Sequence, residues 1–153
     1  MQRLLPPTLV LVLIVVSVIV GVAVPIIGPL SGAWRLAGLV PLVVGLWLNL
    51  GGAGLFSRLD TNIRTFDEPG RLVTAGPFRF SRNPMYLGFM AVLAGVALLV
   101  GSLSAWMGPV AFFGAANFWY IPFEEARMRS NFGDDYDHYR SRVRRWVGPV
   151  RTA

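Results

Sequence analysis

The sequence has 153 residues, of which 54% are hydrophobic and only 14% are charged, and its net charge is +6. About a quarter of the residues of an ordinary soluble domain are charged, so this composition excludes such a domain. The sequence contains no cysteine and a single histidine, His138, which excludes a disulfide framework and a thiolate metal site and counts against a histidine-based one.

Four apolar segments follow one another along the chain. No charged residue occurs between Arg3 and Arg35, between Arg35 and Arg58, or between Arg82 and Glu124. A bilayer span needs roughly 20 apolar residues, so these gaps hold one, one and two spans. We expect transmembrane helices at about residues 4–24, 34–56, 84–101 and 105–123, within one all-α membrane domain over residues 1–153 whose cytoplasmic tail covers residues 124–153.

The first segment resembles a signal peptide in its position. Its apolar run from Leu9 to Val24 is longer than an ordinary signal core, and no convincing small-residue cleavage site follows it. We therefore expect it to be retained as a span.

The second segment contains Gly45, Gly51, Gly52 and Gly54. Small residues let transmembrane helices approach closely, so these glycines predict helix packing. A cofactor loop at Gly52-Ala53-Gly54 is an alternative, but no strand precedes it, which excludes a dinucleotide-binding fold.

The fourteen basic residues are all arginines. With four spans, Arg35 falls on one side of the membrane and every other arginine on the other. The positive-inside rule then places both termini and the central loop in the cytoplasm, in a bacterial-type inner or plasma membrane. A basic chain can also bind nucleic acid, but topology explains this distribution, and we expect no nucleic-acid partner.

A long loop of mixed charge, residues 57–83, precedes the third span, and loops of this length are usually functional or disordered. Asn83 has a side chain that can cap the following helix, and Pro84 suits its first position. The helix start carries free N–H groups and the positive end of the helix dipole. We therefore expect an anion site at this edge of the membrane.

The residues from Gly101 to Ser104 predict a tight turn between the third and fourth spans. An antiparallel hairpin follows, and it brings the start of the third span close to Glu124 and Glu125. A ligand with an anionic and a cationic group fits such a site. S-adenosylmethionine has both, and its sulfonium and adenine favour aromatic faces such as Tyr86, but these residues do not select it uniquely.

The tail predicts a helix over residues 124–131, a break at Gly133 and a second helix capped by Asp134. An aromatic and apolar stripe on that second helix comprises Tyr136, Tyr139, Val143 and Trp146. An interfacial helix held by anionic lipid would explain this pattern without any function.

Two blocks of the sequence resemble the membrane-embedded isoprenylcysteine carboxyl methyltransferases and phospholipid methyltransferases. The run 72–88 contains the family pattern of arginine, histidine or asparagine, proline, any residue, tyrosine, any residue and glycine, from Arg82 to Gly88. The second block runs from Glu124 to Trp146. It has an acidic pair, a phenylalanine-glycine pair, two tyrosines three apart and a basic end.

The resemblance implies methyl transfer from S-adenosylmethionine to a lipid or lipidated acceptor that enters from the bilayer. It makes cofactor-site candidates of Gly76, Arg82, Asn83, Pro84, Tyr86, Leu87, Gly88, Glu124, Glu125 and Tyr139. Arg82 and Arg142 become candidates for orienting an acidic acceptor. An amine or hydroxyl acceptor would need a base, for which Glu125, Asp67 and His138 are candidates.

One departure from the isoprenylcysteine branch concerns the acceptor. That branch has basic residues shortly before the acidic pair, whereas residues 120–123 here carry no charge. The departure counts against a prenylated-cysteine carboxylate and leaves other lipids open. Two other functions remain: an NADPH-dependent membrane reductase, whose 2′-phosphate the tail arginines could bind, and a non-enzymatic membrane scaffold.

Overall fold

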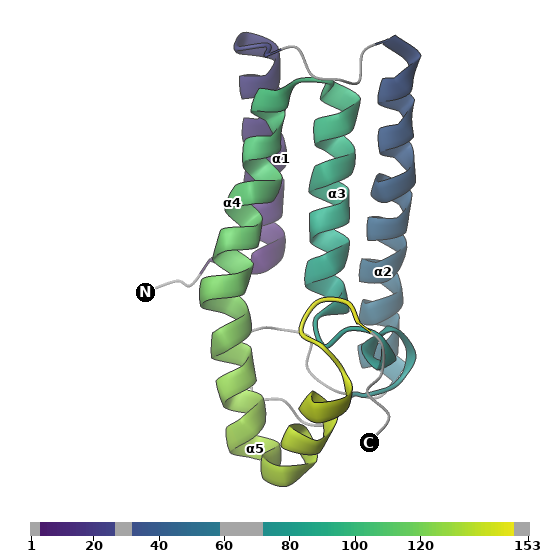
Figure 1. Cartoon of the computed structure of the whole chain (residues 1–153), viewed down its shortest axis with the longest axis vertical. Coiled ribbons are helices and arrows are strands. Elements are labelled where there is room, and N and C mark those ends of the chain that lie inside the picture. Colours follow the sequence, from purple (N-terminus) through teal and green to yellow (C-terminus); the bar gives the residue numbers. More distant parts are fainter. Residues whose placement is uncertain (1–3, 27–31, 59–71, 149–153) are drawn as a thin grey trace.

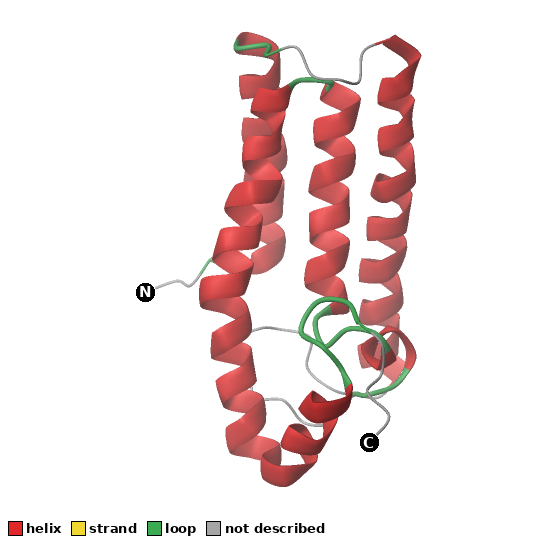
Figure 2. Cartoon of the chain, in the orientation of Figure 1, coloured by secondary structure: helices red, strands yellow, loops and turns green. Residues whose placement is uncertain are grey.

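The computed structural model describes residues 4–26, 32–58 and 72–148, and these are helical apart from short connections, with no strand among them (Figure 2). The main helices are α1 (Pro6–Ala23), α2 (Leu39–Arg58), α3 (Pro84–Val100), α4 (Met107–Ala115) and α5 (Ile121–Arg142). Short 3-10 helices lie at η1 (Gly32–Gly38), η2 (Gly76–Arg79) and η3 (Leu103–Trp106), and η4 (Ala116–Tyr120) is a π-helical turn. The expected all-α fold is confirmed.

The α3 helix lies at the centre of the bundle, in contact with α1, α2 and α4 (Figure 1). The buried core between α1, α3 and α4 includes Leu13, Leu93, Phe112 and Tyr120. Each of these side chains is 9% exposed or less. Burial of these large side chains stabilises the packing of α3 against α1 and the fourth helical run.

Glycines allow α2 and α3 to approach almost backbone to backbone. A Cβ atom on Gly38 would lie 2.5 Å from the carbonyl oxygen of Gly95, and one on Gly95 would lie 2.7 Å from that of Gly38. About two helical turns further along, Gly45 faces Gly88 in the same way. Small residues serve this purpose in membrane bundles, where close packing replaces the hydrophobic driving force.

The packing role expected for the glycines of the second segment holds for two of the four. A Cβ atom on Gly45 or on Gly52 would collide with α3, at the Gly88 carbonyl and at Met85 respectively. Gly51 and Gly54 have no atom within 4 Å of such a Cβ, so they do not pack against another element. All four lie inside α2, which excludes a cofactor loop there.

Two helices are long and apolar enough to cross a membrane, Pro6–Ala23 and Gly32–Ser57, while Pro84–Val100 is a shorter apolar helix. Both long helices carry large exposed apolar side chains, among them Val15, Val22, Trp47 and Leu50. Extended apolar surface of this kind suits contact with lipid.

The expected hairpin between α3 and α4 is confirmed. Gly101 ends α3 in the left-handed conformation, with φ 72°. Ser102 then exchanges hydrogen bonds with Ile26, accepting from its N–H at 3.1 Å and donating to its carbonyl at 3.2 Å. The turn is therefore fixed to the end of α1. Arg35 lies beside Gly101 at this end of the bundle, whereas Arg82 precedes α3 at the other end.

The fourth helical run is longer than the predicted span. It passes from α4 through η4 into α5 without interruption. The first break comes at Gly133, where φ is 48° and ψ is −122°, at the residue predicted to break the tail helix. In Figure 1 the run extends beyond the other helices and then turns back toward the start of α3.

The tail stripe divides between two packing sites. Tyr136, Tyr139 and Val143 are buried together against Leu72, Met128 and Phe132, so they are core residues. Trp146 packs elsewhere: its ring stacks on that of Phe113 in α4, with 5.3 Å between the ring centroids. The stripe therefore does not form the lipid-facing side of an interfacial helix.

Candidate functional site

A cavity of about 50 Å³ lies where the start of α3 meets α5 and the returning tail. Its apolar lining comes from Phe56, Leu72, Val73, Phe78 and Met128. Its polar lining comes from Arg82, Asn83, Glu124, Glu125, Tyr136 and Tyr139. The predicted meeting of the third-span start with the acidic pair is confirmed.

Tyr86 joins α3 directly to α5. Its hydroxyl donates a hydrogen bond to Oε1 of Glu124 at 2.9 Å, and its ring stacks on Tyr120 at 6.2 Å. The side chain is 6% exposed, so this bond forms away from bulk water, where a bond to a charged acceptor contributes about 1.5–3 kcal/mol. Tyr86 and Glu124, both predicted site residues, thus form one unit.

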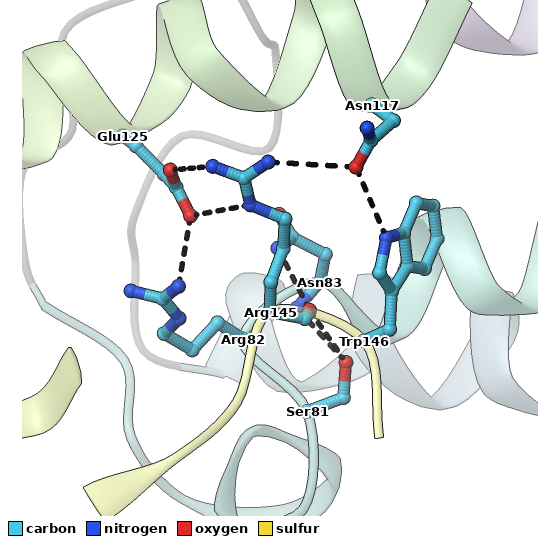
Figure 3. A network of polar contacts seen from close by, with 7 residues as sticks. All are labelled: Ser81, Arg82, Asn83, Asn117, Glu125, Arg145 and Trp146. Carbon is cyan, nitrogen blue, oxygen red and sulfur yellow. Dashed lines mark hydrogen bonds and ion pairs between the residues drawn. The ribbon is translucent and has the colours of Figure 1, made fainter. Parts of the chain in front are cut away.

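Glu125 lies between two arginines (Figure 3). Nη2 of Arg82 is 3.0 Å from Oε1. Nε of Arg145 donates to Oε1 at 3.1 Å, and Nη2 of Arg145 donates to Oε2 at 2.6 Å. One carboxylate therefore pairs with two guanidinium groups.

Arg82 has unused hydrogen-bonding capacity. Its side chain is only 9% exposed, and its Nε and Nη1 atoms are buried without a hydrogen-bond partner among the described residues. Figure 3 shows the second end of its guanidinium pointing away from Glu125. Buried charged donors are costly to leave unpaired, and an anionic ligand group would satisfy them.

Asn83 does not cap α3, contrary to the sequence prediction. Its side chain makes no cap hydrogen bond; instead Nδ2 donates to the Arg145 carbonyl at 3.0 Å. The hydroxyl of Ser81 donates to the same carbonyl at 3.4 Å and accepts the Asn83 N–H at 3.0 Å. The Asn83 amide is thus bonded to the tail and not to the helix, while Pro84 begins the helix as expected.

Tyr139 fixes the turn that precedes α3. Its hydroxyl donates to the Phe78 carbonyl at 2.7 Å, within the segment that begins at Gly76, where φ is +59°. Burial raises the pKa of the Tyr139 hydroxyl, and burial followed by the nearby charge of Glu125 raises that of Tyr136. Both phenols are therefore neutral at pH 7, and that of Tyr139 acts as a hydrogen-bond donor.

Several predicted residues lie outside this cluster. Arg142 and His138 are exposed on α5. Gly88 packs against Asn49 of α2, and Leu87 is half-buried on α3. Asp67 lies outside the described residues.

Two functional candidates were missed by sequence reasoning, Arg145 and Asn117. The carboxylate of Glu125 lies 20 positions before its strongest partner, Arg145, and only the fold-back of the tail joins them. Asn117 lies in η4, and its Oδ1 accepts from Arg145 Nη1 at 3.4 Å and from Trp146 Nε1 at 3.3 Å. A polar residue in a long apolar segment was the available signal, because such residues are often functional.

The donor and acceptor set suits a ligand with both an anionic and a cationic group. Arg82 offers N–H donors, the acidic pair offers carboxylates, and the remaining walls are apolar or aromatic. Ligand pockets usually enclose about 300–1,000 Å³. A cofactor-sized molecule would therefore have to displace some of the groups that now close the site.

Comparisons with known proteins give two matches. The family described as phospholipid methyltransferase matches residues 34–135. The chain is also similar to an uncharacterized protein of Haemophilus influenzae, with 38% identity over 63 residues, which are 41% of this chain and the whole of that protein. No solved structure matches the chain. The family match includes α2, α3, α4 and the acidic pair, and it ends before Tyr136 and Tyr139 of the cavity lining.

Proposed function

The chain belongs to the phospholipid methyltransferase family, and from this premise we propose that it transfers a methyl group from S-adenosylmethionine to a lipid at the cytoplasmic face of a membrane. The observation that carries the proposal is the pairing of Arg82 with Glu124 and Glu125 around one cavity. Two donors of Arg82 find no partner in the described part of the chain. This set matches the charged ends of an amino-acid group.

The membrane arrangement that we propose has four spans, formed by α1, by η1 with α2, by α3 and by the α4–η4 run. Support comes from the two long apolar helices and from the exposed apolar side chains along them. Arg35 lies at the turn end of the bundle, and Arg82 lies at the site end. The positive-inside rule then orients the site, and both termini, toward the cytoplasm.

For the cofactor, we assign Arg82 to a carboxylate and the pair Glu124 and Glu125 to an ammonium group. Tyr86 orients Glu124, and Tyr139 holds the turn that begins at Gly76. Asn83, Pro84, Leu87 and Gly88 position the start of α3 rather than offering charged groups. The buried donors of Arg82, which have no partner within residues 4–26, 32–58 and 72–148, are the feature of this chain that fits the cofactor.

S-adenosylmethionine, when bound, supplies an electrophilic methyl group. The chain contributes mainly position, since holding two reactants in line can remove about 7–11 kcal/mol of a barrier. The apolar walls exclude water from the reacting groups. Both oxygens of Glu125 already accept hydrogen bonds, so we assign it to orienting the cofactor ammonium group and not to removing a proton. Arg142, exposed at the end of α5, is our candidate for contact with the acceptor head group.

Calorimetric titration of the detergent-solubilised protein with S-adenosylhomocysteine, and separately with NADPH, tests the proposal. We expect micromolar binding of S-adenosylhomocysteine and none of NADPH. Binding of NADPH without binding of S-adenosylhomocysteine would favour a reductase. Binding of neither ligand would favour a scaffold.

A further inference from the structure

Arg145 holds Glu125 more completely than Arg82 does. Two of its nitrogens contact the two carboxylate oxygens at 3.1 and 2.6 Å, whereas Arg82 reaches one oxygen through a single nitrogen at 3.0 Å. A bidentate fork between a guanidinium and a carboxylate is both stronger and more directional than a single contact. The orientation of the Glu125 carboxylate is therefore set chiefly by Arg145.

The remaining nitrogen of Arg145 is held by η4, and the neighbouring Trp146 is held by η4 and α4. Its Nη1 donates to Oδ1 of Asn117 at 3.4 Å, and the same oxygen accepts from Trp146 Nε1 at 3.3 Å (Figure 3). The Trp146 ring stacks on Phe113. Each guanidinium nitrogen of Arg145 thus has a partner, while Nε and Nη1 of Arg82 have none among the described residues.

We propose that Arg145 is a positioning residue that reserves the free donors of Arg82 for an anionic ligand group, a carboxylate or a phosphate. Arg145 does so by occupying both oxygens of Glu125. Without it, Glu125 would be free to turn toward Arg82 and form the fork there, because this is the preferred geometry of an arginine–carboxylate pair. The free donors of Arg82 would then be lost to the ligand.

The anionic group has two possible sources under the proposed function, on which this inference rests. It is either the carboxylate of the cofactor or an anion of the lipid acceptor. Four forms of the full-length protein in detergent distinguish them: wild type, Arg145→Ala, Arg145→Lys and the control Arg144→Ala. The control removes the same charge from an exposed neighbouring side chain. It keeps the backbone carbonyl of Arg144, which accepts the backbone N–H of Arg82 at 3.0 Å.

Three probes are titrated into each form. S-adenosylhomocysteine carries the amino-acid group, 5′-methylthioadenosine lacks it, and inorganic phosphate, followed by phosphorus NMR, stands for an acceptor anion. If the cofactor supplies the anion, Arg145→Ala weakens S-adenosylhomocysteine binding about 10- to 100-fold and leaves 5′-methylthioadenosine binding unchanged. If the acceptor supplies it, S-adenosylhomocysteine binding is unchanged, and phosphate binding to the saturated protein is lost.

Arg145→Lys should fall between wild type and Arg145→Ala, because an ammonium group restores the charge but not the fork. Equal behaviour of Arg145→Ala and Arg144→Ala with every probe would overturn the proposal. An equal loss of S-adenosylhomocysteine and 5′-methylthioadenosine binding would also overturn it, since that result indicates general damage to the site.

Failure of the proposed function is a separate result. If the wild-type protein binds no S-adenosylhomocysteine, methyl transfer is wrong, but phosphate binding to the ligand-free protein still tests Arg145. Phosphate binding to wild type that is weakened in Arg145→Ala and kept in Arg144→Ala would support the positioning role. Absence of phosphate binding to wild type in that case would overturn it.

Discussion

The contact between α2 and α3 and the contact between α3 and the returning tail are built on different physical principles. Between α2 and α3, glycines bring one backbone against the other, and a single added carbon would collide. At the start of α3, the tail is joined by hydrogen bonds and ion pairs between Asn83, Arg82, Glu125 and Arg145. The first contact depends on shape alone, and the second on charge and donors.

This difference indicates which part of the molecule can change when a ligand binds. Close-packed backbones admit few alternative arrangements, so α2 and α3 form a fixed base. Hydrogen bonds and ion pairs can be exchanged for equivalent bonds to a ligand at little net cost. Substitutions that disturb one contact and spare the other test this division.

The largest effect is expected from Glu125→Ala, which should disrupt the polar contact alone. The change leaves Arg82 and Arg145 without their shared carboxylate, and it removes a predicted partner of the cofactor ammonium. We expect S-adenosylhomocysteine binding to weaken at least about 100-fold, since bonds between charged groups contribute about 1.5–3 kcal/mol each. Calorimetry measures the loss, and helical content by circular dichroism should stay unchanged.

Asp137→Ala is the matched control for Glu125→Ala, because it removes an acidic residue of the same helix that pairs only on the surface. Wild-type affinity in Glu125→Ala would return Glu125 to a purely structural role at the beginning of the tail helix.

Gly45→Ala should disrupt the shape-dependent contact alone. The new Cβ atom would collide with the Gly88 carbonyl and lie 2.7 Å from the Val92 nitrogen. Overpacking of this kind costs about 1–3 kcal/mol. Thermal unfolding in detergent, followed by helical circular dichroism, should show a lower midpoint.

Gly51→Ala provides the comparison on the same helix, because no atom lies within 4 Å of its added Cβ. Alanine has the higher helix propensity, so this variant should be as stable as wild type or up to about 1 kcal/mol more stable. Equal destabilisation by both changes would show that close approach is not what matters at Gly45.

Tyr139→Phe should change how the free energy of unfolding depends on pH. The variant loses the bond to the Phe78 carbonyl, which contributes about 1 kcal/mol. Burial raises the pKa of the Tyr139 hydroxyl, so above pH of about 10 the folded state keeps a proton that the unfolded state releases. Wild-type stability should therefore fall as the pH rises beyond that value.

Denaturant unfolding at several pH values between neutral and strongly alkaline measures this prediction. The stability difference between wild type and Tyr139→Phe should be greatest near neutral pH and shrink above pH of about 10. A difference that stays constant would mean that the hydroxyl ionises equally in both states.

The smallest effect is expected from breaking the pair between Arg129 and Asp137. Their atoms approach to 2.9 Å, but the side chains are 61% and 38% exposed. Exposed ion pairs contribute about 0–1 kcal/mol. Asp137→Ala should change the unfolding midpoint within experimental error, and a large shift would mean that the kink at Gly133 depends on this pair.

Much of the architecture could be predicted from where charges are absent. The gaps between arginines located the helices, and Gly101 and Ser102 marked the hairpin turn. The hairpin turn predicted that the start of α3, with Tyr86, lies close to Glu124, and the 2.9 Å hydrogen bond confirms this. Each of these inferences used composition or local conformation, which a single sequence displays directly.

The details of the site depended on tertiary competition and could not be predicted in the same way. Asn83 suits an N-cap, in which its Oδ1 would accept a helix N–H, but its amide is instead held by the bond from Nδ2 to the Arg145 carbonyl. The sequence does not distinguish Arg142 from Arg145, because both are arginines of a basic tail. In the structure Arg145 forms the ion pair with Glu125, whereas Arg142 is exposed. The direction in which the tail returns decides both outcomes.

The π-helical turn at η4 has a consequence for the rotational phase of the helix that follows. A π turn contains one residue more than the α-helical turn it replaces, and one residue corresponds to about 100° around a helix axis. If Ala116–Tyr120 were regular α-helix with no residue removed, Glu124 and Glu125 would face about 100° away from Tyr86 and Arg82. The π turn therefore sets the rotational phase of α5, so that the acidic pair faces the cavity.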